Sequence, residues 1–390
     1  MTMQATVRNL KGGTLSKASS QWQTRPDDER YETLDSLLSA TLDHKKRSMV
    51  GEVDLRDLRM VDGGGYPAVV GPSGVAVRPN HWAFGQLCQR AQAPAGYIRS
   101  LPVGLAIDCV RTGLEAANES AEARLLIRAP DARNTGTHAE LCALTSPKYQ
   151  RVWNHEVAQT LVDLRERQPA WQFPEPFRTV GGTTAKQWGT GHTGKQVPVA
   201  YASDHDMFVF LCDYEHGVEV GGNTLARGFF VENSEVGDAA FRVTMFLFDF
   251  VCSNILVWGA KNVVEVKMNH VGSIRDRVLH NGSQVLKALA AYGQSSAFEQ
   301  KQAILHAQQM KLGDDNEEVL RKLFSNKSLG ISKKDIEAAQ VVAEENPRYG
   351  DPRTVWAMAN GLTEVSQRAP YADARIKLDR AAGEVLRFAF

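Results

Sequence analysis

The sequence predicts an α+β protein with a central antiparallel sheet, packed helices and a helical C-terminal region. Strand-like runs rich in Val, Phe and Leu are concentrated between residues 206 and 270, whereas apolar residues recur at helical spacing after Gly272. The composition, with 43% hydrophobic and 23% charged residues over 390 positions, is typical of globular proteins. It excludes a largely disordered chain.

The N-terminal half alternates between helical and strand patterns. Residues 1–30 lack apolar periodicity, so we expect a mobile arm with order beginning near Glu32. Beyond this arm the patterns predict helices over 34–47, 80–91, 102–117 and 154–167, short strands between 50 and 77, and strands over 123–128 and 139–145.

The C-terminal half combines the strongest strand signal with the helical tail. Strands are expected over 207–214, 225–232, 241–248 and 263–268, with a turn over 218–223, although 244–255 also fits a buried helix. The predicted organisation is an arm at 1–30, an N-terminal α+β region at 31–170, a β-rich core at 171–290 and a helical region at 291–390. The apolar residues of the tail exceed what a small bundle needs to bury, which predicts a homo-oligomer.

Several classes of protein are excluded by what the sequence lacks. No apolar window is long enough to cross a bilayer and no secretory signal is recognisable, so we expect a cytoplasmic protein without a membrane partner. No phosphate-binding loop, zinc-protease motif, nucleophile elbow or dinucleotide fingerprint occurs. We therefore expect neither an enzyme nor a cofactor.

The net charge is zero, with 45 basic and 45 acidic residues, so binding to a polyanion requires local segregation of charge. Such segregation occurs in the basic loop, residues 177–203, which has no acidic residue up to Ser203 and contains Arg178, Lys186 and Lys195. A glycine-rich basic loop can follow a phosphate backbone while Trp188 stacks on a base. The alternative is a structural crossing in which Trp188 belongs to the core.

A second basic segment stands at the entry to the helix expected over 154–167. Lys148 and Arg151 would add to the attraction of a helix N-terminus for phosphate. Equally, the neighbouring Tyr149 and Trp153 can attach the helix to the sheet.

Three further basic residues lie on the predicted sheet. Lys261 comes just before its last strand, and Lys267 belongs to that strand. Arg227 lies on an earlier strand. With the residues above they complete the predicted nucleic-acid-binding set, although Lys267 shares a strand face with Glu265 and can form an ordinary surface ion pair.

Acidic and imidazole groups also gather near residue 205. Strand alternation would place Asp204 and Asp206 on one face and His205 on the other, and the spacing matches no compact ligand motif. We therefore expect no metal. A metal-dependent nuclease using Asp204, Asp206 and Glu235 is the least favoured alternative.

Four strings together resemble a known group, the phage/plasmid-like protein family known as domain of unknown function nine-three-two. They are Trp153-Asn154-His155-Glu156, Ala202 to Phe208, Arg227 to Gly237, and Val251-Cys252-Ser253-Asn254 with Trp258-Gly259-Ala260. The resemblance covers roughly residues 80 to 290 and implies a phage or plasmid context. More weakly, residues 206–290 are similar in architecture to the single-strand annealing recombinases of the Red-beta and Rad-fifty-two type, which form rings or filaments.

The expected function is therefore single-stranded DNA binding and annealing in homologous recombination by a homo-oligomer, ring or filament, that needs no nucleotide. Its expected partners are single-stranded DNA and a host or phage replication or recombination protein. The alternative from another class is a protein-binding inhibitor of a host defence system.

Overall fold

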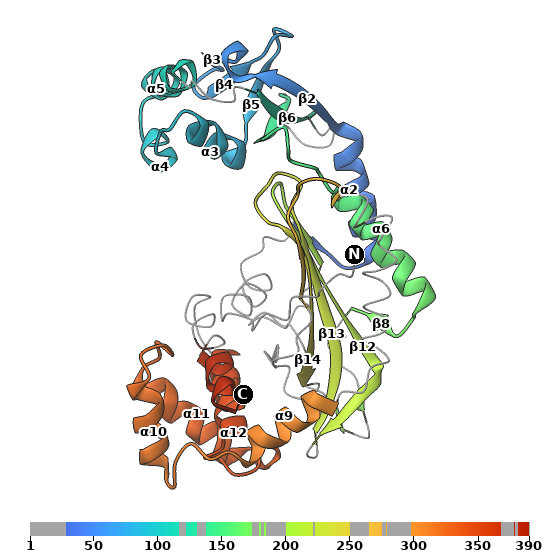
Figure 1. The fold of residues 1–390 in the computed structure, drawn as a ribbon, viewed down its shortest axis with the longest axis vertical. Helices are drawn as coiled ribbons and strands as arrows, with labels where there is room; N and C mark the ends of the chain where they lie inside the picture. The colour runs from blue at the N-terminus through green and yellow to red at the C-terminus, as the bar shows by residue number, and fades with distance from the viewer. Residues whose placement is uncertain are drawn as a thin grey trace.

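The structure is a computed structural model. It describes residues 29–116, 122–130, 138–173, 179–180, 183–184, 200–220, 223–249, 265–274, 278, 298–367, 378 and 381–389. Three parts follow one another along its long axis: a sheet with small helices, a larger sheet with two helices, and a group of helices that contains the C-terminus (Figure 1). Each part encloses a hydrophobic core, and the two sheets meet at the site described below.

The first sheet has the strand order β2-β6-β7-β5-β4-β3, and only the β5–β7 pair is parallel. Its strands are β2 (Ser48–Asp54), β3 (Arg59–Asp62), β4 (Pro67–Val70), β5 (Ala76–Pro79), β6 (Glu122–Arg128) and β7 (Glu140–Thr145). Helices α3 (His81–Arg90), α4 (Ala95–Ile98) and α5 (Val103–Glu115) contribute apolar side chains to the same core. The Asn80 side chain caps α3 by accepting a hydrogen bond from the Ala83 N–H at 2.8 Å, as the sequence predicts.

The central sheet has the order β1-β11-β12-β13-β14-β15, with β8 also paired to β12 and every pair antiparallel. Its strands are β1 (Arg30–Tyr31), β8 (Trp171–Gln172), β11 (Ala200–Ala202), β12 (Met207–Val220), β13 (Asn223–Asn233), β14 (Phe241–Asp249) and β15 (Glu265–Met268). One face packs against α2 (Leu34–Arg47) and α6 (Asn154–Arg167), which lie beside each other in Figure 1. Alternate residues of β12, including Met207, Val209 and Leu211, belong to this core because strand side chains alternate between faces.

The C-terminal part is helical. It contains α9 (Phe298–Gln309), α10 (Asn316–Ser325), α11 (Lys333–Glu345) and α12 (Val355–Gln367). Helices α11 and α12 approach so closely that a Cβ on Gly361 would stand 2.3 Å from the Ala339 carbonyl oxygen, so glycine is required there. Leu225 of β13 belongs to the same core, which joins this part to the central sheet.

The predicted fold class is confirmed, with three differences in detail. Strand β1 spans Arg30–Tyr31, just before Glu32, whereas residues 1–28 of the predicted arm lie outside the described residues. Residues 244–249 are the end of strand β14 rather than the start of a helix, because they extend the pairing with β13. The turn expected over 218–223 is shorter, since residues 218–220 still pair with 223–225.

The domain boundaries stay predictions. In the part of the chain that the structure describes, no helix is long and apolar enough to cross a membrane.

Candidate functional site

Five of the predicted nucleic-acid-binding residues lie outside the described residues: Arg178, Lys186, Trp188, Lys195 and Lys261. In the basic loop before Ala200, only the short strands β9 (Thr179–Val180) and β10 (Thr183–Thr184) are described, and they pair as an antiparallel hairpin. The role predicted for the basic loop remains a prediction.

Lys148 and Lys267 are both exposed and belong to adjoining segments. Tyr149 forms an isolated antiparallel bridge with Val271, and the Gln150 N–H donates to the His270 carbonyl at 2.8 Å. The rings of Tyr149 and His270 stack with centroids 4.9 Å apart. The structure therefore brings together two basic segments that the sequence separates by more than one hundred residues.

The other two described cations, Arg151 and Arg227, are buried. Arg151 donates from Nε to the Glu235 carbonyl at 2.6 Å, and its guanidinium lies over the rings of Tyr149 and Trp153. Arg227 is paired in register with Asp213 on β12. Both arginines are thus buried, and Arg151 contacts groups of the protein itself. The nucleic-acid-binding role predicted for the two residues stays a prediction.

This arrangement is explained by a turn between β13 and β14, residues 233–238, which we call the junction turn and which is buried over residues 233–236. Three successive carbonyl groups of the junction turn accept hydrogen bonds from side chains outside it. Tyr149 donates to the Ser234 carbonyl at 2.8 Å, Arg151 donates to that of Glu235, and Gln86 of α3 donates to that of Val236 at 2.8 Å. The Trp82 indole also donates to the Val236 carbonyl, at 3.2 Å. Side chains of α3 and of the segment before α6 therefore hold this turn against the first sheet.

The side chains of the junction turn are also engaged. Glu235 Oε1 accepts from the N–H of Asn154, the first residue of α6, at 2.7 Å, and Oε2 lies 3.6 Å from Arg128 Nη2. Burial raises the pKa of Glu235, while these donors favour its charged form. Asn233 donates to Asn154 Oδ1 at 2.7 Å. Glu235 is thus a structural carboxylate fixed at the helix N-terminus.

This geometry argues against a nuclease centre built from Asp204, Asp206 and Glu235. The exposed Asp204 pairs with Arg128 at 3.5 Å, and the same guanidinium faces the buried Glu235. Arg128 therefore occupies the space where a metal shared by these two carboxylates would bind.

A polar cavity of about 420 Å³ opens where the first sheet meets the junction turn. It is lined by Gln86, Gln89, Arg90, Leu144, Thr145, Ser146, Tyr149 and Gly237. Most of these residues carry amide, hydroxyl or guanidinium groups, and no carboxylate is among them. The Gln86 amide and the Tyr149 hydroxyl are bonded to neighbouring protein groups. Arg90 and the two glutamines were missed by the sequence reasoning, because helical spacing places them on α3 without indicating that α3 borders another sheet.

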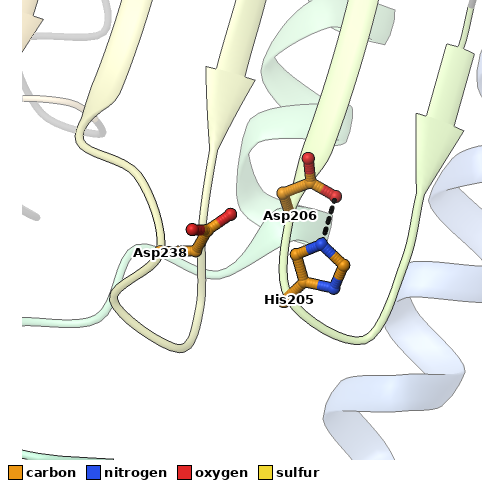
Figure 2. A group of neighbouring side chains, drawn as sticks. All are labelled: His205, Asp206 and Asp238. Atoms are coloured by element: carbon orange, nitrogen blue, oxygen red, sulfur yellow. Dashed lines mark ion pairs between the residues drawn. The ribbon is translucent and has the colours of Figure 1, made fainter. Parts of the chain in front are cut away.

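A second group lies next to the cavity, in the turn between β11 and β12 and at the end of the junction turn. His205, Asp206 and Asp238 each offer a ligand atom, and these atoms lie within 4.8 Å of one another (Figure 2). The expectation that His205 and Asp206 point to opposite faces is wrong, because residues 203–206 form a turn closed by the Ser203 N–H and the Asp206 carbonyl at 2.9 Å. Strand alternation does not apply within such a turn.

Comparison with known proteins gives one result, a family model. Neither the curated proteins nor the solved structures contain a match. The model described as domain of unknown function (DUF932) matches residues 143–382, more than half of the chain. The match begins later than residue 80 and extends further than residue 290, so it covers α6, the junction turn and the C-terminal helices but not α3. The chain therefore belongs to the DUF932 family.

Proposed function

We propose that the protein binds single-stranded DNA along the face formed by the polar cavity, Lys148 and Lys267, and that it anneals complementary strands. The observation that carries the proposal is the cavity itself, which is lined by Arg90, amides and hydroxyls without a carboxylate. In a chain with no net charge, the guanidinium of Arg90 gives this lining a local positive charge that attracts phosphate, while the carboxylate of Asp238 lies outside it.

The dimensions and chemistry of this face suit a flexible strand. A cavity of about 420 Å³ is large enough to admit part of a nucleotide, and the side-chain amide of Gln89 can hydrogen-bond to base edges or phosphate oxygens. The amide of Gln86 is engaged with the Val236 carbonyl and the Leu144 N–H, so it shapes the cavity wall instead. Lys148 follows the lining residue Ser146 by two positions and is exposed. A strand that enters the cavity would therefore meet a second cation at its rim.

Annealing by such a surface needs no nucleotide and no covalent step. Neutralising phosphates on two strands and holding them at high local concentration accelerates pairing. We place this activity in homologous recombination on a phage or plasmid, in the host cytoplasm, with a homo-oligomer as the working form. A replication or recombination protein of the host or phage would be its further partner.

The proposal is tested by fluorescence anisotropy with a labelled oligonucleotide over a series of salt concentrations. Arg90→Ala and Lys148→Ala should each weaken binding, and the weakening should be the same for every oligonucleotide sequence. Each substitution should also reduce the slope of log affinity against log salt by about 0.7. Arg111→Ala is the matched control, since this exposed arginine on α5 pairs with Asp108 away from the cavity. Its slope should equal that of the parent.

Two results would overturn the proposal. A parent protein that binds no oligonucleotide at low salt would favour the inhibitor of a host defence system instead. Binding that is unchanged in Arg90→Ala and Lys148→Ala but lost in Lys186→Ala and Lys195→Ala would move the DNA-binding surface from the cavity to the basic loop.

A further inference from the structure

We propose that His205, Asp206 and Asp238 bind one divalent metal ion of the first transition row, for which Mn²⁺ and Zn²⁺ are suitable probes. One imidazole nitrogen and two carboxylate oxygens form a mixed set that suits these ions. Their ligand atoms lie within 4.8 Å of one another, and the side chains come from two separate turns (Figure 2). The proposal replaces the sequence expectation of a metal-free protein and does not depend on DNA binding.

The hydrogen bonds of Ser203 fix the turn that carries two of the ligands. The Ser203 hydroxyl donates to Asp206 Oδ1 at 2.6 Å and accepts from the backbone N–H groups of His205 and Asp206, each at 3.2 Å. His205 Nδ1 lies 3.2 Å from the same oxygen. One side chain therefore sets the positions of His205 and Asp206 through the backbone, which is how groups behind a metal site orient its ligands.

The second ring nitrogen of His205 faces a carboxylate oxygen at a suitable distance. His205 Nε2 lies 3.8 Å from Asp206 Oδ1. Two ligands that share an ion at about 2.1 Å each are separated by about 3.0–4.2 Å, depending on the angle at the metal. A cation between these two atoms would be attracted to the lone pairs of both.

The third ligand is held in place by a buried hydroxyl. Ser234 donates to the carbonyl of His205 at 2.6 Å and accepts from the N–H of Asp238 at 3.0 Å. One fully buried side chain therefore ties together the backbones of two ligands from different turns. The Trp82 ring covers one face of the His205 imidazole, since the two rings stack with centroids 6.0 Å apart and planes 15° from parallel.

The ligands also leave room for exchangeable groups. The Asp206 side chain is buried, whereas the His205 side chain is 41% exposed and Asp238 is exposed. Three protein ligands with access to solvent leave the remaining coordination positions to water or to a ligand oxygen. Gly237, which precedes Asp238, lines the polar cavity, so such a ligand could also occupy that cavity.

The experiment is isothermal titration calorimetry of the full chain with MnCl₂ and, separately, ZnCl₂. We expect one ion per chain, with affinity that falls as the pH is lowered because protons compete for the ligands. Asp238→Asn and His205→Gln should each weaken binding by about tenfold or more. Asp204→Asn is the matched control, since it changes a neighbouring exposed carboxylate that pairs with Arg128.

Melting temperatures of the three variants in the absence of metal should match that of the parent, because the substituted side chains are at least partly exposed. Absence of stoichiometric binding by the parent would show that His205 and Asp206 form an ion pair only, and would overturn the proposal. So would equal loss of affinity in Asp204→Asn, or retention of parental affinity in both ligand variants.

Discussion

His44 is held neutral by its surroundings at the end of α2. Burial, together with the guanidinium groups of Arg128 and Arg47, lowers the pKa of His44 from 6.5 to about 4. The folded protein therefore binds a proton at this site less readily than the unfolded chain does. The stability contributed by His44 is complete above pH 6.5 and is lost as the pH falls from 6.5 towards 4.

A substitution at this position should reduce the sensitivity of the fold to acid. Between pH 7 and pH 5, protonation of His44 in the unfolded state should cost the parent about 2 kcal/mol of unfolding free energy. The His44→Gln variant should not show this decrease in unfolding free energy, because the glutamine side chain does not titrate. Urea unfolding of both proteins at the two pH values checks it. An equal decrease in both would show that His44 is not the responsible group.

At the scale of single elements, the junction turn depends on Gly237. This residue has a φ of 89°, a conformation that residues with a Cβ rarely adopt. A Cβ here would lie 3.7 Å from both Thr145 and Tyr149, which is ordinary contact, so the cost of a side chain comes from the backbone rather than from a clash.

Gly237→Ala should therefore lower the unfolding free energy by about 1–2 kcal/mol. Gly51→Ala is the control, because Gly51 lies on strand β2 with no atom within 4 Å of the added methyl group and should leave stability unchanged or slightly higher. Chemical denaturation of the two variants makes the comparison. Equal stability of Gly237→Ala and the parent would mean that the turn relaxes to a different conformation.

The elements could be predicted where a local pattern decides the structure. Helix α6 spans residues 154–167 as its apolar spacing predicts, and Asn80 caps α3 as expected. The turn at residues 203–206 departs from the alternation that the sequence predicts, because the Ser203 hydroxyl organises it. A hydroxyl next to two acids is a signal for such a turn.

The candidate site was harder to predict, because its groups come together only in the tertiary structure. The sequence singled out Lys148 and Arg151, but burial of Arg151 follows from a carbonyl that lies 84 residues further along the chain. Gln86 reaches Val236 across 150 residues. Local periodicity places each side chain on its element and carries no information about the element that it meets.

At the scale of the whole molecule, most of the apolar residues from which the sequence predicts self-association are buried in the core of the C-terminal region itself. Among those described, Phe324 and Val341 are the large exceptions, at 56% and 50% exposed. The apolar residues of the tail therefore give little support to self-association. A surface that is better suited to pairing between two copies of the chain lies at the other end of the molecule.

That surface is the outer strand of the first sheet. In the part of the chain that the structure describes, β2 pairs with β6 alone and forms the edge of the sheet. Met49 and Val50 on this strand are 65% and 47% exposed. A seven-residue edge strand that carries exposed apolar side chains is a ready template for pairing with another chain. We therefore propose that β2 of one copy pairs with a second copy in the homo-oligomer.

Lysines at an edge strand oppose such pairing, because they bring like charges together and must be desolvated. The double variant Met49→Lys and Val50→Lys should shift the protein from a multiple of 43 kDa to a single 43 kDa species, as measured by light scattering across micromolar concentrations. Its melting temperature at low concentration should be unchanged, since both side chains are exposed. Val75→Lys, which alters an equally exposed residue before β5, should leave the mass of the assembly as in the parent. A parent protein that is monomeric throughout this range would refute self-association, and an assembly that persists in the double variant would exclude the β2 edge as its interface.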